Sequence, residues 1–140
     1  MQKNGTIHAQ FNGIAEAVVT ECGVRAIAGN NTSKGGVYYA IWDTGAYQSC
    51  ISPKVVEELG LETVAQIPNY TAGGMVMSTL HYVEMVLPNG VGAFKCLAAC
   101  CPIGHLDILI GMDIIAQGDF HLANQNGNTI FTFKIENNKQ

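Results

Sequence analysis

One stretch decides the fold: residues 37–46, which read Val-Tyr-Tyr-Ala-Ile-Trp-Asp-Thr-Gly-Ala. Its first six residues are apolar, many of them β-branched or aromatic, and this composition favours a buried β-strand. The strand runs directly into Asp43, Thr44 and Gly45, so it delivers one carboxylate into a tight turn. The Thr44 hydroxyl can form hydrogen bonds, and Gly45 lets another backbone or a ligand approach closely. Asp43 is therefore either satisfied by the amides of its own turn or kept there for chemistry.

The composition predicts a chain with much of its surface covered. A length of 140 residues indicates a single domain spanning residues 1–140. Hydrophobic residues make up 48% of the chain and charged residues only 13%, below the usual fraction of about a quarter. A compact β core or a partner subunit would provide that cover. The seven Lys and Arg residues are scattered singly, so no cationic stripe exists and we expect no nucleic-acid partner.

The distribution of apolar residues and cysteines indicates the cellular compartment of the protein. No apolar run approaches the length that spans a bilayer, and residues 1–5 lack the apolar core of a signal peptide. The five cysteines are odd in number and irregularly spaced, which is typical of free thiols in a reducing compartment. We therefore expect a cytoplasmic protein with no membrane association.

Short elements flank the central stretch on both sides. Ser52, Pro53 and Gly60 suit the cap, the first turn and the left-handed end of a short helix over residues 52–60. The Gly73-Gly74 pair predicts the tip of a hairpin over residues 69–77. Further strands are expected over residues 6–11, 14–24, 61–67 (ending at Pro68), 75–87, 93–101 and 106–111. One or two helical turns are expected over residues 112–117. A final hairpin over residues 119–135 should turn at Asn126-Gly127, and residues 136–140 should form a frayed tail. Short strands, glycine turns and one or two short helices, without a βαβ rhythm, predict an all-β domain closed into a small barrel.

These features together resemble the retropepsin family, the retrovirus-like aspartic proteases that have relatives in bacteria and phages. The resemblance rests on Asp43-Thr44-Gly45-Ala46 after an apolar strand, on the Gly73-Gly74 hairpin, and on the segment Ile108-Leu109-Ile110-Gly111-Met112-Asp113. The order matches as well: Asp-Thr-Gly, a short helix, a glycine-rich flap, then an apolar strand that ends in glycine before a helical turn. The similarity covers residues 26–123, and the segments outside it are either additions or dimer-forming strands.

The resemblance assigns roles to individual residues. Asp43 would be catalytic, Thr44 would hydrogen-bond across a dimer axis, and Gly45 and Ala46 would form the loop beside the substrate backbone. The flap that closes over an extended peptide would carry Ala72, Gly73, Gly74 and Met75. Ile110 and Gly111 would pack behind the active loop. Asp113 would either orient the neighbouring backbone or act as a carboxylate at a helix start.

The chemistry of amide hydrolysis adds a requirement on assembly. Water needs a base to remove its proton and the carbonyl oxygen needs an acid, and two carboxylates that share one proton supply both. Only Asp43 stands in an Asp-Thr-Gly or Asp-Ser-Gly sequence. An aspartic protease of this sequence must therefore be a two-fold homodimer in which each subunit provides Asp43. It would cleave a polypeptide without a metal or another cofactor.

Tyr47 departs from the family pattern and keeps a second function open. The family usually places Ser, Asp or Thr after the Asp-Thr-Gly-Ala sequence, whereas this chain has Tyr47-Gln48. Tyr47 would then change the specificity of the substrate site. Alternatively, the chain is a non-catalytic module that uses the same groove to dimerise or to hold a peptide.

Other polar clusters have simpler interpretations. Cys96, Cys100, Cys101 and His105 lie within ten residues and could suggest zinc, but adjacent cysteines on a strand point to opposite faces and no Cys-x2-Cys pair exists. Core thiols are the expected alternative. The histidines His8, His81 and His121 are isolated and are expected at the surface or at strand edges.

Overall fold

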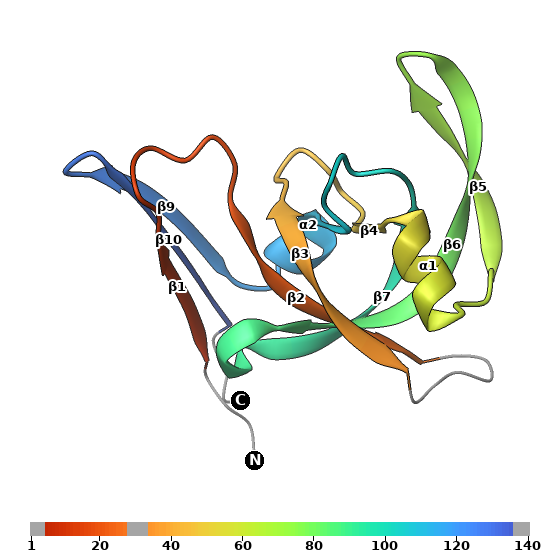
Figure 1. Cartoon of the computed structure of the whole chain (residues 1–140), viewed down its shortest axis with the longest axis horizontal. Helices are drawn as coiled ribbons and strands as arrows, with labels where there is room; N and C mark the ends of the chain where they lie inside the picture. The colour runs from red at the N-terminus through yellow and green to blue at the C-terminus, as the bar shows by residue number, and fades with distance from the viewer. Residues whose placement is uncertain (1–4, 28–33, 136–140) are drawn as a thin grey trace.

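The computed structural model of the chain describes residues 5–27 and 34–135 (Figure 1). The expected frayed tail lies outside these residues. The elements along the chain are β1 (Thr6–Gln10), β2 (Val19–Ala26), β3 (Gly35–Trp42), β4 (Cys50–Ile51), α1 (Pro53–Leu59), β5 (Ala65–Thr71), β6 (Gly74–Leu87), the 3-10 turn η2 (Pro88–Gly90), β7 (Gly92–Cys100), β8 (Ile108–Ile110), α2 (Met112–Ile115), β9 (Asp119–Gln125) and β10 (Asn128–Lys134).

Six strands close into a barrel. They are hydrogen-bonded in the order β2-β3-β8-β4-β7-β6, and the ring closes because β2 also pairs with β6. Strand β5 pairs only with β6 among the described strands, and the β5–β6 hairpin extends away from the barrel at the upper right of Figure 1. The structure confirms the predicted all-β class, with a closed barrel and two short helices.

A second sheet covers the strand that leads to Asp43. It has the order β1-β10-β9 and lies at the opposite end of the molecule from the β5–β6 hairpin (Figure 1). The Trp42 ring packs against Phe131 and Phe133 of β10, with ring centroids 5.0 and 4.9 Å apart. The Trp42 indole N–H also donates to the Thr20 hydroxyl at 2.9 Å. Burial of these rings and the satisfied indole fix the end of β3, and with it the position of the next residue, Asp43.

Helix α1 forms as its sequence predicts. The Ser52 hydroxyl accepts a hydrogen bond from the Val55 N–H, Pro53 begins the helix, and Gly60 ends it in the left-handed conformation with φ 59°. The cap is tied to the barrel, because the same hydroxyl donates to the Asp107 carboxylate at 2.8 Å. The β9–β10 hairpin also turns at Asn126-Gly127 as expected, with φ of 53° and 79°.

Two predicted strands have wrong boundaries: the one predicted over residues 14–24, and the one predicted over residues 61–67, which begins only at Ala65. Residues 14–18 are not part of a strand, since β2 begins at Val19. The amides of Gly13 and Ala15 instead donate to the side chains of Asn128 and Thr129, both at 2.8 Å, so distant side chains replace a strand partner. Strand β5 passes through Pro68, whereas the predicted strand ended there. A proline is tolerated at this position because β5 is an edge strand.

The prediction for His81 is also wrong. This side chain is only 1% exposed, while His8 and His121 are exposed as expected. The His81 ring forms hydrogen bonds to the Thr79 hydroxyl at 2.8 Å and to the Glu62 carbonyl at 2.9 Å. It therefore connects the segment after α1 to β6, at the base of the projecting hairpin.

Candidate active site

Asp43 lies on the first residue after β3, where the chain turns. Its backbone N–H donates to the Ile110 carbonyl at 2.8 Å, and its carboxylate Oδ1 accepts from the Gly45 N–H at 2.8 Å. Asp43 is half-buried, whereas Thr44 and Gly45 are exposed. A side chain at Gly45 would place its Cβ 3.2 Å from that carboxylate oxygen. The loop thus fixes one oxygen of Asp43 and leaves the backbone beside it uncovered.

Strand β8 and the residue after it support this loop from behind. Residues 40–42 of β3 pair in parallel with residues 108–110 of β8, which places Trp42 opposite Ile110. Gly111 follows, and a Cβ there would lie 2.8 Å from the Ala46 carbonyl oxygen and 3.0 Å from that of Gln48. The next amide, of Met112, donates to the same Ala46 oxygen at 2.7 Å. Only glycine allows this close approach of two backbones.

Ser49 and Asp113 complete the support, and sequence reasoning did not identify Ser49. The Asp113 carboxylate accepts from the Ser49 hydroxyl at 2.7 Å and from the Ser49 N–H at 3.0 Å. The hydroxyl oxygen of Ser49, which is fully buried, accepts from the Gly111 N–H at 3.0 Å. Asp113 therefore orients the chain beyond the Asp43 turn through Ser49. A serine between Gln48 and Cys50 carries no spacing signal that would reveal this contact.

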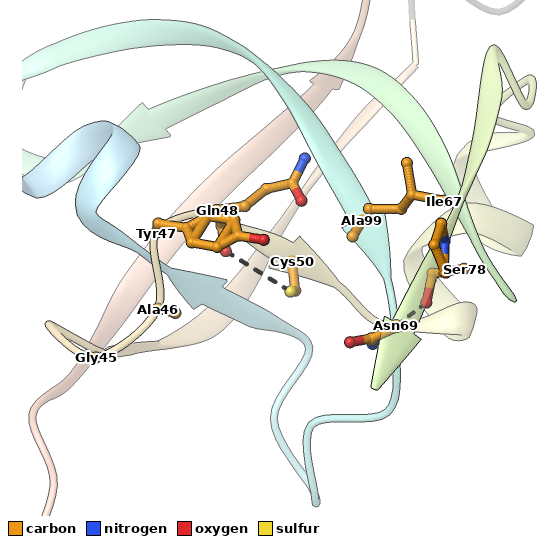
Figure 2. Close-up of a pocket in the computed structure, with 10 residues that line it drawn as sticks. Gly45, Ala46, Tyr47, Gln48, Cys50, Ile67, Asn69, Ser78 and Ala99 are labelled. Atoms are coloured by element: carbon orange, nitrogen blue, oxygen red, sulfur yellow. Dashed lines mark hydrogen bonds between the residues drawn. The ribbon is translucent and has the colours of Figure 1, made fainter. Parts of the chain in front are cut away.

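A pocket of about 230 Å³ opens beside the Asp43 turn (Figure 2). The loop after Asp43 forms one side, the hairpin arms β5 and β6 form the other, and Cys50 and Ala99 lie between them. Among the predicted site residues, Gly45, Ala46 and Tyr47 line it, and the Tyr47 side chain is 83% exposed. The lining that the site prediction missed consists of Gln48, Cys50, Ile67, Pro68, Asn69, Ser78 and Ala99.

The predicted flap residues lie at the far end of the β5–β6 hairpin. The hairpin turns through Ala72 and Gly73, and Gly74 begins β6 with φ 116°, a conformation that favours glycine. The tip thus lies one residue earlier than the Gly73-Gly74 pair suggested. Met75 is 55% exposed. These four residues do not line the described pocket, so the structure does not bring them against the Asp43 turn.

The other three aspartates each lie in a different environment. Asp107 accepts from Ser52 and lies 3.8 Å from the Lys54 ammonium group. Asp113 is bound by Ser49, and Asp119 is exposed at the start of β9. Among residues 5–27 and 34–135, no three His, Cys, Asp or Glu side chains are grouped as metal ligands would be. Within the same ranges, no helix is long and apolar enough to cross a bilayer.

Comparison with known proteins identifies the family. The model of the family described as gag-polyprotein putative aspartyl protease matches residues 32–117, more than half of the chain. The chain belongs to this family. The matched region of this aspartyl protease family runs from before β3 to the end of α2, and so contains Asp43, the flap and Asp113. No curated protein matches the sequence.

A solved structure supports the fold of this aspartyl protease family member over nearly its whole length. The crystal structure of a retropepsin-like aspartic protease from Rickettsia conorii is similar with a TM-score of 0.56. The likeness covers 97% of this chain and 98% of that chain, at 11% sequence identity. The predicted retropepsin-like barrel is thereby confirmed as the fold.

Proposed function

We propose that this protein is a homodimeric aspartic endopeptidase that hydrolyses an extended polypeptide. One observation carries the proposal: the Asp43 carboxylate stands at the end of a strand fixed by packing and hydrogen bonds, beside a pocket whose other side is formed by the arms of the β5–β6 hairpin. Membership of an aspartyl protease family supports the same reaction class.

The proposed mechanism uses two copies of Asp43. Two carboxylates about 3 Å apart cannot both ionise, so one removes a proton from water while the other protonates the carbonyl oxygen. Asp107 and Asp113 are engaged elsewhere and Asp119 is exposed at the start of β9 in the second sheet, so we infer that a second chain supplies the second carboxylate. Thr44, which is exposed, would hydrogen-bond across the two-fold axis.

The pocket and the hairpin suit an extended peptide. Gly45 and Ala46 leave backbone accessible at one wall, and the edge strand β5 together with the tip residues could pair with a peptide as an added strand. Closure of the hairpin over the peptide would exclude water from the reacting bond. Tyr47 at the pocket mouth would then act on specificity.

The deciding experiment is cleavage of a diverse peptide library between about pH 4 and 7, the range in which paired carboxylates work, read by mass spectrometry. The wild type is compared with Asp43→Asn, which keeps the shape of the side chain but cannot act as the base. Asp119→Asn is the matched control, because it removes an exposed aspartate that does not line the pocket. We expect cuts in the wild type and in the control that disappear in Asp43→Asn.

Sedimentation equilibrium on the same samples tests the assembly. A dimer is expected at the protein concentration at which peptides are cut. Cleavage by a monomer would overturn the shared dyad. A folded dimer that cuts no peptide would overturn the endopeptidase and favour the non-catalytic peptide-binding module.

A further inference from the structure

The pocket beside the Asp43 turn is polar but carries no charge. None of the ten described residues that line it is Asp, Glu, Lys, Arg or His. Its volume of about 230 Å³ lies below the range of about 300 to 1,000 Å³ that is typical of small-molecule sites, so it suits one side chain of a longer ligand. The preference for that side chain therefore depends on neutral hydrogen-bonding groups and on shape.

Asn69 provides a hydrogen-bond acceptor from the hairpin side of the pocket. Residues 67 and 69 share one face of β5, and Ile67 lies opposite Ser78 of β6. The Asn69 amide nitrogen donates to the Ser78 hydroxyl at 3.3 Å, and Ser78 is only 5% exposed. This bond turns the amide so that its oxygen lies on the side of the loop after Asp43 (Figure 2). The oxygen is thereby available to a ligand in the pocket.

Gln48 provides a second amide from the loop side. Its side-chain nitrogen donates to the Leu97 carbonyl of β7 at 2.9 Å, and its backbone carbonyl accepts from the Cys50 thiol at 3.8 Å. The nitrogen points away from Cys50, and the oxygen is the amide atom nearer to Tyr47 and Cys50 in Figure 2. Both amides are thus held through their nitrogen atoms before a ligand arrives, and each presents its oxygen as an acceptor.

A primary amide is the side-chain group that complements these acceptors. The amide of a glutamine or asparagine has two N–H donors and no charge. An apolar side chain would cover the oxygens of Asn69 and Gln48 without replacing their hydrogen bonds to water, which costs free energy. A carboxylate would place further acceptors against them. An ammonium group would lose its water without an anion in the pocket lining to pair with.

We infer that this pocket selects a glutamine or asparagine side chain of the peptide substrate, with Asn69 as the specificity-determining residue. The inference rests on the proposed function and names the substrate class of the same site. Gly45 and Ala46, which follow Asp43 in the turn, also line the pocket. The selected residue therefore flanks the peptide bond that is cleaved.

The proposed homodimer doubles this preference. Each subunit carries the same pocket, because the two-fold axis repeats every surface of the chain. An extended peptide that crosses both Asp43 turns meets one pocket on each side of the reacting bond. Cleavage sites should therefore carry an amide side chain on both sides of the cut, and a charged residue at either position should be disfavoured.

The first test is the residue preference around the cuts that the wild type makes in a diverse peptide library. One cut peptide is resynthesised with glutamine, leucine, glutamate or lysine at the selected position, and kcat/KM is measured for each. The glutamine peptide should be favoured about tenfold over the others, the effect of one hydrogen bond of ordinary strength. Equal or faster cleavage of the leucine peptide would overturn the inference and leave the endopeptidase standing.

Variants of Asn69 test its role on the same four peptides. Asn69→Leu should abolish the advantage of the glutamine peptide over the leucine peptide. Asn69→Asp should gain cleavage of the lysine peptide, because a carboxylate then faces the pocket, and a merely structural loss creates no new preference. Gln66→Leu is the matched control, since it removes an amide from the other face of β5 that does not line the pocket. An unchanged order of peptides in both Asn69 variants would overturn the inference.

A binding arm decides the case in which the wild type cuts no peptide. The library is passed over immobilised full-length Asp43→Asn, and the retained peptides are identified by mass spectrometry. Retention of peptides rich in glutamine and asparagine would support the selective pocket and overturn only the endopeptidase. Retention of apolar peptides, or of none, would overturn the inference together with the endopeptidase.

Discussion

The two sides of the pocket are built in opposite ways. The site base (residues 42–51 and 108–113) contains fully buried Ser49, Ile51 and Ile110, and its backbones are joined by hydrogen bonds across the barrel. The flap (residues 65–79) exposes Met75, Val76 and Met77 by more than half each. Segments with few buried contacts open at low free-energy cost, whereas a buried network opens only when the domain unfolds. The comparison teaches that the carboxylate is held in place while the outer part of the flap is left to move.

Gly111→Ala should have the largest effect on the free energy of unfolding, because it adds a side chain inside the closely packed site base. The new Cβ would meet two backbone carbonyl oxygens, at 2.8 and 3.0 Å, and neither can move away cheaply. We expect a loss of about 3 kcal/mol in the free energy of unfolding, the upper range for an overpacked core. Urea unfolding measures it.

Gly74→Ala is the same substitution on the flap, and its effect on stability is compared with that of Gly111→Ala. An added Cβ there meets no atom within 4 Å, so its cost arises only from the positive φ of 116°. We expect about 1 kcal/mol, confined to the turn. An equal loss of unfolding free energy in both variants would contradict the difference between site base and flap.

Among the variants of the site base, Ser49→Ala should have the next largest effect on the free energy of unfolding. It leaves the Gly111 N–H without its acceptor and Asp113 without one donor, and an unsatisfied buried polar group costs about 2 kcal/mol. A double-mutant cycle with Asp113→Asn should give a coupling of about 1 kcal/mol. The cycle with Asp119→Asn, an exposed aspartate at the start of β9, should be additive, and additivity in both cycles would refute the network.

Replacing Tyr38, which lies on β3, tests whether the strand that leads to Asp43 is also held firmly before it reaches the site base. Burial, and then the hydrogen bond that its hydroxyl donates to Glu58 on α1 at 2.9 Å, raise the pKa of Tyr38 to about 12. Because the folded pKa exceeds the unfolded value near 10, the contribution to stability is complete below about pH 10. It is lost as the pH rises through about 12.

The measurement is the unfolding free energy from pH 9 to 12 in the wild type and in Tyr38→Phe, which keeps the ring. The free energy of unfolding of the variant should be about 1 kcal/mol lower than that of the wild type at neutral pH. The variant should also lack the fall in stability that deprotonation of Tyr38 causes in the wild type at high pH. The difference in absorbance titration between the two proteins should have its midpoint near pH 12. A midpoint near 10 would show that Tyr38 is not held by α1.

The smallest effect on stability is expected for Met75→Ser and Met77→Ser on the flap. Both side chains are more than half exposed, so the unfolding free energy should change by less than about 0.5 kcal/mol. If the flap closes over a peptide, KM should rise in the same variants. A large loss of stability would mean that the flap is packed in the free protein.

The sequence predicted the elements whose signals are local. Helix α1 has its cap, proline and glycine in one short segment, and the β9–β10 turn has Asn126-Gly127, so adjacent residues determine each conformation. The strand before Asp43 was equally readable, because six apolar residues precede the carboxylate. The retropepsin-like barrel followed from the order of these signals.

Features that depend on distant residues were not readable. Residues 14–18 were assigned to a strand, because the side chains that bind the backbone of Gly13 and Ala15 lie on β10. The role of Ser49 was overlooked and His81 was wrongly expected at the surface or a strand edge for the same reason: their partners, Asp113 and Glu62, are not neighbours in the sequence. The pocket lining likewise comes from four separate segments and has no common spacing.

The parallel pairing of residues 40–42 with residues 108–110 has a consequence for biosynthesis. Asp43 emerges from the ribosome before β8, the strand that positions it, because β4, β6 and β7 are made between them. Contacts between such distant segments form late and slowly in folding. The growing polypeptide would therefore carry the Asp43 carboxylate before its position is fixed, and any proteolytic activity would have to await the synthesis of β8.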